Sequence, residues 1–271
     1  MEVNSGGTAP DASGQTFTAS GTLTAASGAK STDNVGTGGI AYDIQDILLG
    51  ADGVTVDIST ENTLTRNLTG IGGLTKSGSG TLILGGVNTY TGATTVSAGG
   101  TLQAGAANTI QNSGAVIVNG TFALNGYDQT IKNLSGTGAI TLGGATLTVN
   151  QSRDGAFSGV ISGTGTLTKT GAGALTLSGN ANSVSSVTVA GGALNLSGGL
   201  LTSGILIRDA AAFNITGASA TLTVNGLVDV ESGGTFDLTK HPGLLDIGQS
   251  SSLRNAGTVR LSNPPCRRPD C

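Results

Sequence analysis

Apolar and polar residues alternate in short segments that recur along most of the chain. In each segment a small residue is followed by Leu or Phe, then a variable residue, then an aliphatic one. Alternation with a period of two is typical of a β-strand that buries one face. Copies of this four-residue module begin at Thr81, Thr101, Thr121, Thr146, Ala174, Ala193, Thr221 and Thr235, of which the copy at Thr101, TLQA, is the weakest.

The spacing of the modules predicts a coiled chain. The first and last copies are 154 residues apart over seven intervals, a mean spacing of 22 residues, which is in the range of solenoid proteins. Glycine-rich corners, such as Ser97–Gly100 and Glu231–Gly234, separate the modules and allow sharp turns without a Cβ clash. We therefore predict an all-β fold, a right-handed parallel β-helix (solenoid) of about a dozen coils.

A longer repeat lies within this pattern. Residues 49–96 align without a gap with residues 142–189, at an offset of 93, and eight of thirteen positions are identical between Gly72–Leu84 and Gly165–Leu177. We interpret the offset as an internal duplication of several coils. It predicts that the two copies occupy equivalent places on the same wall of the helix.

The expected domain organisation is one β-helix with two different ends. We assign residues 40–261 to the β-helix, residues 1–39 to an irregular N-terminal lead-in and residues 262–271 to a Pro-, Cys- and Arg-rich tail that is disordered or non-native. Residues 40–49 form either a short helix, because their isoleucines have helical spacing, or an irregular first coil.

Composition and charge exclude several classes of function. Of the 271 residues, 37% are hydrophobic, only 10% are charged and 47 are Gly, and the net charge is −4. A nucleic-acid partner would require a basic stripe, which the chain lacks. The chain also has no apolar stretch long enough to span a membrane and no evident secretion signal at its N-terminus. The chain is therefore expected either to remain inside the cell or to be a fragment.

The most specific feature of the sequence is a family resemblance. Residues Gly70–Gly105 and Gly159–Gly179 resemble the autotransporter-associated β-strand repeat of type V secretion passenger domains, and Phe122–Val149 resembles the segment that commonly follows it. The resemblance covers roughly Leu49–Gly199. It implies a bacterial surface-exposed or secreted passenger, attached to the outer membrane and carried outward by a C-terminal β-barrel translocator. With 3% aromatic residues, the chain lacks the aromatic girdles of such a barrel, so we expect it to be part of a passenger.

Catalytic chemistry has little support in the sequence. The single histidine, His241, is followed by Pro242, and neither a nucleophile elbow nor a phosphate-binding loop occurs. Sugar-cleaving enzymes usually offer aromatic platforms, but the chain has no Trp and only Tyr42, Tyr90 and Tyr127. We therefore predict no catalytic residues and no enzymatic activity.

Paired carboxylates keep one enzymatic hypothesis open. Stacking in a β-helix can bring distant acidic residues together, one coil apart, where two of them could share a proton or a cation. This alternative is a polysaccharide lyase or glycosidase. The densest acidic group of the C-terminal third would serve it: Asp229, Glu231, Asp237 and Asp246.

No metal or cofactor site is predicted. The glycine-rich calcium pattern lacks its aspartate, and the acidic segments Asp43–Asp46 and Ala51–Asp57 are isolated. Cys266 and Cys271 can form a disulfide, but two thiols alone lack the further ligands of a closed zinc site.

Asparagine occurs in two settings. We interpret the glycosylation-like sequons as chance and the asparagines near glycine corners as turn formers in preference to stacked amides. The first set is Asn67, Asn133, Asn195 and Asn214, and the second is Asn88, Asn119, Asn125 and Asn225.

The leading hypothesis is a structural or adhesive passenger segment of a bacterial surface autotransporter. It acts as a rigid stalk or contact surface, and its expected partners are a host-cell or extracellular-matrix surface, or other copies of itself through the sides or ends of the rod. Besides the sugar-cleaving enzyme, a phage tailspike or fibre segment is a further alternative, which would normally trimerise.

Overall fold

The structure, a computed structural model, describes residues 46–240 and 252–261, together with the backbone of short strands between residues 2 and 25 and at 246–247. Every regular element in this part of the chain is a β-strand. No helix in it is long and apolar enough to cross a membrane.

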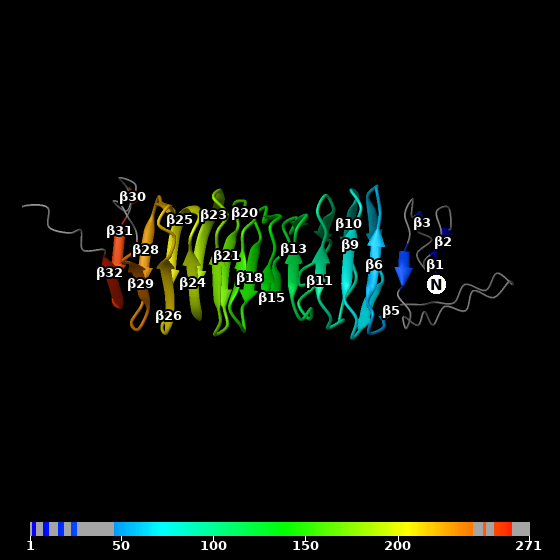
Figure 1. Cartoon of the computed structure of the whole chain (residues 1–271), viewed down its shortest axis with the longest axis horizontal. Coiled ribbons are helices and arrows are strands. Elements are labelled where there is room, and N and C mark those ends of the chain that lie inside the picture. Colours follow the sequence, from blue (N-terminus) through cyan, green and yellow to red (C-terminus); the bar gives the residue numbers. More distant parts are fainter. Residues whose placement is uncertain are drawn as a thin grey trace, which may run out of the picture.

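The strands wind into a rod of about ten stacked turns (Figure 1). Each full turn contributes one strand or irregular segment to each of three faces, which we number 1, 2 and 3 in chain order. Strands of successive turns pair in parallel along each face. The predicted parallel β-helix is confirmed, with about ten turns in place of a dozen, while its right-handed sense stays a prediction.

Face 1 is irregular in its early turns and regular later. Between its second and third strands the chain crosses it without regular structure, although hydrogen bonds such as Thr89 N to Leu68 O (2.7 Å) continue the stack. Its strands are β5 (Asp46–Leu49), β8 (Asn67–Gly70), β15 (Gln129–Lys132), β18 (Thr146–Asn150), β21 (Thr166–Thr170), the second halves of β23 (Asn182–Val189) and β25 (Gly199–Ile207), β28 (Leu227–Val230) and β31 (Ser252–Asn255).

Face 2 runs the full length of the rod. A parallel bridge between Gly136 and Phe157 joins its two halves. Its strands are β6 (Val54–Asp57), β9 (Leu74–Ser77), β11 (Thr94–Val96), β13 (Val116–Val118), β16 (Leu134–Ser135), β19 (Gly155–Phe157), β22 (Ala174–Leu177), β24 (Gly192–Leu196), β26 (Ala211–Ile215), β29 (Thr235–Leu238) and β32 (Thr258–Leu261).

Face 3 meets face 1 in two long strands, β23 and β25, which bend from face 3 to face 1. The other strands of face 3 are β7 (Asn62–Leu64), β10 (Thr81–Leu84), β12 (Thr101–Ala104), β14 (Thr121–Ala123), β17 (Ala139–Thr141), β20 (Val160–Ser162), β27 (Thr221–Val224) and β30 (Asp246–Ile247).

The module marks a strand and not a whole coil. The copies at Thr81, Thr101 and Thr121 lie on face 3, the copy at Thr146 lies on face 1, and the copy at Ala174 lies on face 2. The intervals of 19 or 20 residues separate copies on one face, and the irregular intervals occur where the module changes face. In the strand register, equivalent residues are 18 to 25 positions apart.

The two copies of the 93-residue repeat do not lie on the same face of the β-helix, so the prediction that they occupy the same wall is wrong. Val96 ends β11 on face 2, whereas Val189, its equivalent in the second copy, ends β23 on face 1. Because a coil here takes about 20 residues, the offset corresponds to about four and two-thirds turns. The two copies share a local structure but differ by one face.

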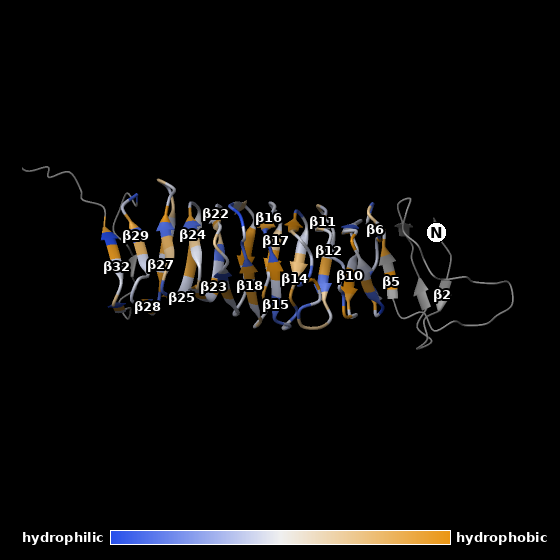
Figure 2. Ribbon diagram, turned by 90° about the horizontal axis from the view of Figure 1, so that it is seen from below, coloured by the Kyte–Doolittle hydropathy of each residue, from blue (hydrophilic) through white to orange (hydrophobic). Residues whose placement is uncertain are grey.

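A continuous aliphatic column fills the rod. Inward positions stack in register, as in Leu82, Leu102 and Phe122 on face 3, each of which is fully buried. Near the C-terminal end the rings of Phe213 and Phe236 pack edge to face, with centroids 5.6 Å apart. The apolar residues alternate with polar ones along the strands, as the hydropathy colouring shows (Figure 2). Burial of this column supplies the main stabilising free energy of the fold.

A column of glycines lines the corner between faces 2 and 3. A Cβ on Gly159 would be 1.8 Å from the carbonyl oxygen of Gly138, and a Cβ on Gly179 would be 1.9 Å from that of Gly159. Side chains at this corner would therefore force successive coils apart. The column consists of Gly100, Gly120, Gly138, Gly159, Gly179 and Gly198.

Short strands of the N-terminal region pair with one another and with the first turn. They make three antiparallel pairings, β1 with β4, β2 with β3 and β4 with β6, and the last covers the hydrogen-bonding edge of the first turn on face 2. The N-terminal strands are β1 (Glu2–Val3), β2 (Thr8–Pro10), β3 (Thr16–Thr18) and β4 (Leu23–Ala25).

For residues 40–49 the sequence left two alternatives, a short helix or an irregular first coil. Strand β5 pairs in parallel with β8, so residues 46–49 belong to the first coil, as the second alternative predicted. The other residues of that segment, 40–45, and the tail, 262–271, lie outside the described residues.

Candidate interaction surface

The four candidate acidic residues do not stack on one another. They belong to a single turn: Asp229 lies on face 1, Glu231 at the next corner, Asp237 on face 2 and Asp246 in β30 on face 3. Residues on different faces are separated by the aliphatic core. The expectation that two of them lie one coil apart is therefore wrong.

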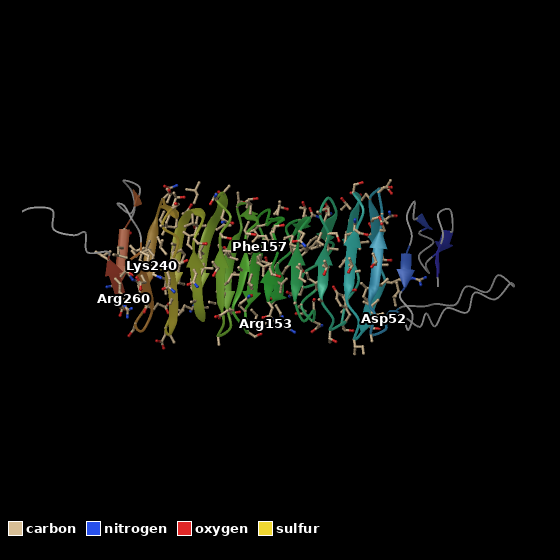
Figure 3. All side chains as sticks on the ribbon, in the orientation of Figure 1. Asp52, Arg153, Phe157, Lys240 and Arg260 are labelled. Atoms are coloured by element: carbon tan, nitrogen blue, oxygen red, sulfur yellow. The ribbon has the colours of Figure 1, made fainter. Side chains whose placement is uncertain are left out.

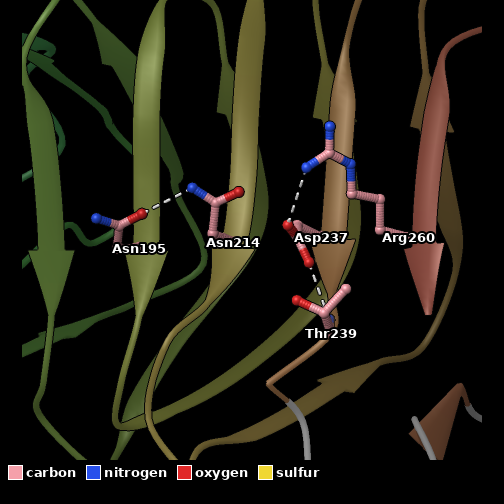
Figure 4. Close-up of polar contacts among 5 residues, drawn as sticks. All are labelled: Asn195, Asn214, Asp237, Thr239 and Arg260. Carbon is pink, nitrogen blue, oxygen red and sulfur yellow. Dashed lines mark hydrogen bonds and ion pairs between the residues drawn. The ribbon is translucent and has the colours of Figure 1, made fainter. Parts of the chain in front are cut away.

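Two of these carboxylates are instead paired with arginines of the following turn. Asp229 Oδ1 lies 3.3 Å from Arg254 Nε, and Asp237 Oδ2 lies 3.7 Å from Arg260 Nη1 (Figure 4). Partial burial acts to raise the pKa of Asp237, but hydrogen bonding from Thr239 and the nearby positive charges outweigh it and lower this pKa. An ionised carboxylate held in this way accepts hydrogen bonds and is unsuited to be a general acid.

The tyrosines of the described region offer no stacking platform. Tyr90 is buried in the core, where its hydroxyl lies 2.6 Å from Thr94 Oγ1, and Thr94 Oγ1 lies 3.0 Å from Ser113 Oγ. Burial raises the pKa of Tyr90 well above its usual value. Tyr127 is 41% exposed but stands alone beside a tight turn.

The remaining candidate chemistry falls largely on residues that the structure does not describe. His241, Tyr42, Asp43, Cys266 and Cys271 are among them. Within residues 46–240 and 252–261, no group of three or more His, Cys, Asp or Glu side chains is placed to hold a metal ion.

Two buried lysines were not anticipated from the sequence. Lys76 on face 2 and Lys169 on face 1 have no exposed surface, although lysine is rarely buried. Lys169 Nζ donates to the carbonyl oxygens of Thr170 (2.8 Å), Gly171 (3.0 Å) and Gly191 (3.0 Å), and Lys76 Nζ donates likewise to those of Ser77 and Gly78. Each ammonium group therefore binds the backbone of a glycine corner.

Burial changes the acidity of both lysines. Desolvation lowers the pKa of Lys169 to about 8, against the raising effect of Asp154. Desolvation also lowers the pKa of Lys76, against the effect of Asp57. The available signal was the LTK-x-G-x-G segment, which occurs in both copies of the 93-residue repeat and places each lysine at an inward position of its strand.

Buried amides connect neighbouring turns. Asn182 Oδ1 accepts from Ile161 N (2.9 Å) in the preceding turn, and Asn182 Nδ2 donates to Gly179 O (2.8 Å) and Gly199 O (2.9 Å). Such side chains satisfy backbone groups where the ladder is interrupted at a corner. The group comprises Asn88, Gln129, Gln151 and Asn182.

The asparagine predictions have a mixed outcome. Asn125 has a positive φ of 52° in an exposed turn, which confirms turn propensity there, but Asn88 is a buried inter-turn bridge. A stacked amide pair does occur at two of the sequons, where Asn214 Nδ2 donates to Asn195 Oδ1 at 2.9 Å (Figure 4). Asn133, a third sequon residue, donates from Nδ2 to Gly114 O at 3.0 Å.

The outer surface of the rod is polar and sparsely charged. Charged side chains such as Asp52 and Arg153 lie at the margin of the rod, whereas Phe157 lies within it (Figure 3). On the flat faces, the outward positions are rich in threonine. Threonines recur in register on face 2 at Thr55, Thr75 and Thr95, on face 3 at Thr81, Thr101 and Thr121, and on face 1 at Thr130, Thr148, Thr168 and Thr188.

Comparison with known proteins identifies the family of this chain. The model of the passenger-associated-transport-repeat matches residues 74–104 and 167–196. These two segments begin at the strands that carry the buried lysines. The chain is also similar to a protein of Brucella suis biovar 1 (strain 1330) described as the adhesin BmaC autotransporter. The two are 37% identical in an alignment 261 positions long, which covers 79% of this chain.

The chain is an autotransporter passenger segment with passenger-associated transport repeats. Its family locates it at the bacterial cell surface, attached to the outer membrane or secreted. The chain spans 8% of the length of the Brucella relative. No solved structure matches it.

Proposed function

We propose that this passenger segment is a rigid stalk whose sides serve as an adhesive contact surface. The observation that carries the proposal is the continuous parallel register of the rod, from β5 to β32, around a single aliphatic core. Ten turns, at about 4.8 Å each, give a rod roughly 50 Å long. The Brucella relative, named as an adhesin, supports an adhesive role.

The proposal includes the absence of catalysis by this segment. Its support is the arrangement of the acidic residues, two of which are ion-paired on different faces, and the burial of Tyr90. The partners we expect are a host-cell or extracellular-matrix surface, or the sides of other copies of the rod. A rod exposes its sides along its whole length, so many weak contacts can act together.

Two measurements test the proposal separately. Small-angle X-ray scattering of the purified chain should give an elongated particle, and a compact particle would contradict the stalk. Beads coupled to the folded chain should be retained on cell monolayers or matrix-coated glass, and free chain should compete with them. Beads coupled to heat-denatured chain at the same density are the control. Equal retention of both kinds of bead would remove the contact role and leave only a spacer.

A further inference from the structure

Face 1 carries two adjacent rows of hydroxyl groups on consecutive turns. In the first row Thr146, Thr166 and Ser186 occupy equivalent positions on β18, β21 and β23. The second row lies two residues further along the same strands and extends onto β15. It consists of Thr130, Thr148, Thr168 and Thr188. Neighbouring strands are about 4.8 Å apart and alternate residues about 6.7 Å apart, so the rows form a regular two-dimensional grid.

Most of these hydroxyl groups have no partner within the protein. Thr166 Oγ1 and Ser186 Oγ lie 2.8 Å apart, and this is the one side-chain hydrogen bond that joins two members of the grid. No hydroxyl group of the second row makes a hydrogen bond within the described residues, although the backbone N of Thr130 donates to Asn108 Oδ1. By contrast, hydroxyls at corners, such as those of Ser185 and Thr164, are bonded to backbone carbonyls. The second row is therefore free to donate to and accept from an external ligand.

The grid is also uncharged. On β18 and β21 the outward side chains are threonines and Asn150, and on the second half of β23 they are Ser186 and Thr188. The nearest charged side chains lie at the first strand of the grid: Lys132 ends β15, and Asp128, just before β15, accepts from Thr146 N at 2.7 Å. On the other side the grid ends at Leu206 of β25. A charged polymer over the hydroxyl rows of β18, β21 and β23 would lose hydration without gaining an opposite charge there.

The other two faces do not repeat this arrangement. On face 2 the threonine row lies beside a row that contains Asp57, and on face 3 it lies beside Ile83, Gln103 and Ala123. Among the described strands, only face 1 combines two hydroxyl rows over three turns. Its strands stack side by side with little change of direction (Figure 1).

We propose that this grid, on β15, β18, β21 and β23, is a binding surface for the ordered surface of a neutral polysaccharide. The neutrality of the grid matches an uncharged ligand. A flat face makes contact through many groups only with another flat surface, and its hydroxyl rows fit a ligand that presents hydroxyls at regular intervals. The inference rests on the adhesive role proposed above and specifies the ligand class of that contact.

The absence of aromatic residues fits this ligand and argues against a single sugar chain in solution. Without a stacking platform, the threonines of each turn contribute only neutral hydrogen bonds, and each such bond strengthens binding by about fivefold. Useful affinity then requires the threonines of several turns to bind at once. Soluble oligosaccharides should therefore bind far more weakly than a crystalline surface.

Microcrystalline cellulose is a suitable probe. Depletion of the purified chain onto it should be measured for the wild type, for the double variant Thr148→Val and Thr168→Val, and for the matched control Thr75→Val and Thr95→Val on face 2. Valine keeps the β-branched shape and strand propensity but removes the hydroxyl. We expect the face 1 variant to lose at least fivefold in its partition constant and the control to stay within twofold of the wild type. Circular dichroism should show that all three are equally folded.

Several outcomes would overturn the inference. One is no depletion of the wild type by cellulose, and another is an equal loss in both variants. Binding that falls steeply between about 0.05 and about 0.5 M salt would indicate charged contacts, which the grid cannot make. If cellulose fails but bead retention on cells persists, the ligand class is wrong and the adhesive role stands. If both fail, the proposed function fails with it.

Discussion

Single residues in this rod stabilise its corners as much as its core. Lys169 is a clear case, because its ammonium group is completely buried yet bonded to three carbonyl oxygens. Three neutral acceptors compensate only partly for lost hydration, which is why the pKa falls from 10.5 to about 8. Lys169 therefore makes stability depend on pH.

The first prediction is a rise in stability at alkaline pH. Between about pH 8 and 10.5 the unfolded chain keeps a proton on Lys169 that the folded chain has released, so the free energy of unfolding increases with pH across this window. Below pH 8 both states hold the proton and this dependence disappears. Guanidinium unfolding at about pH 7, 9 and 10 should show the rise in the wild type, by at most about 1.4 kcal/mol per pH unit.

The control for this prediction is Lys169→Met, which keeps the length of the side chain and removes the titrating group. The variant should be less stable at every pH, because the carbonyls of Gly171 and Gly191 lose the donor that Lys169 Nζ supplies, whereas Thr170 O keeps its bond from Gln151 N. The difference between wild type and variant should widen from pH 8 upward. A difference that is constant with pH would show that Lys169 keeps an ordinary pKa in the folded rod.

A buried amide supports a second prediction. Asn182→Leu removes the acceptor of Ile161 N and one donor each to Gly179 O and Gly199 O, of which Gly179 O keeps its hydrogen bond from Gly199 N. We expect a loss of about 2 to 4 kcal/mol in unfolding free energy. Asn225→Ala, at an exposed asparagine, is the comparison and should change stability by less than about 0.5 kcal/mol. Similar losses in the two variants would contradict the bridging role.

The sequence could not reveal these residues because their role depends on the turns above and below. Alternation in LTKSG places the lysine inward, but the pattern does not show which groups its ammonium binds, because only the stacked corner supplies the carbonyls. The prediction that two of the acidic residues lie one coil apart was wrong for the same reason. These residues are close in sequence, and in a coil of about 20 residues such proximity places them on different faces.

At the scale of the element, alternation predicted the strands correctly but did not predict their faces. Thr81–Leu84 and Ala174–Leu177 share one module, and both bury their second and fourth residues, yet they lie on faces 3 and 2. All three faces pack against the same aliphatic column, so they select the same pattern. The face of a strand is therefore set by the count of residues between corners, which the module does not encode.

The glycine corner gives the third prediction. At Gly159 a Cβ would lie 1.8 Å from Gly138 O and 2.6 Å from Phe157 Cζ, and avoiding this clash would stretch the hydrogen bond from Val160 N to Gly138 O. Gly159→Ala should destabilise the rod by more than about 2 kcal/mol. Gly144→Ala, whose Cβ would meet nothing closer than Thr164 Oγ1 at 3.8 Å, should be neutral or slightly stabilising. Thermal melts of the two variants compare them, and equal melting temperatures would refute the close approach.

At the scale of the whole molecule, stability should be close to a sum over turns and their interfaces. The strand register shows which deletions remove one complete turn and leave the stacking of the other turns unchanged. Thr146, Thr166 and Ser186 are stacked equivalents on face 1, and Gly155, Leu175 and Leu194 on face 2. On face 3 the equivalents are Ser162, Ser183 and Leu201. Residues 166–185 therefore make up one complete turn.

The fourth prediction is that deleting residues 166–185 leaves a folded rod. The deletion joins Gly165 to Ser186, so the second half of β23 pairs with β18, and β24 pairs with β19, with every inward position still inward. The rod should lose one turn and one interface, and its melting temperature should fall by a few degrees.

Deleting only residues 166–175 removes half as much but places a corner where a strand of face 1 belongs and turns aliphatic residues outward. The smaller deletion should therefore be much more damaging, as circular dichroism and thermal melts would show. Survival of the half-turn deletion together with unfolding of the full-turn deletion would mean that the stacked register is wrong.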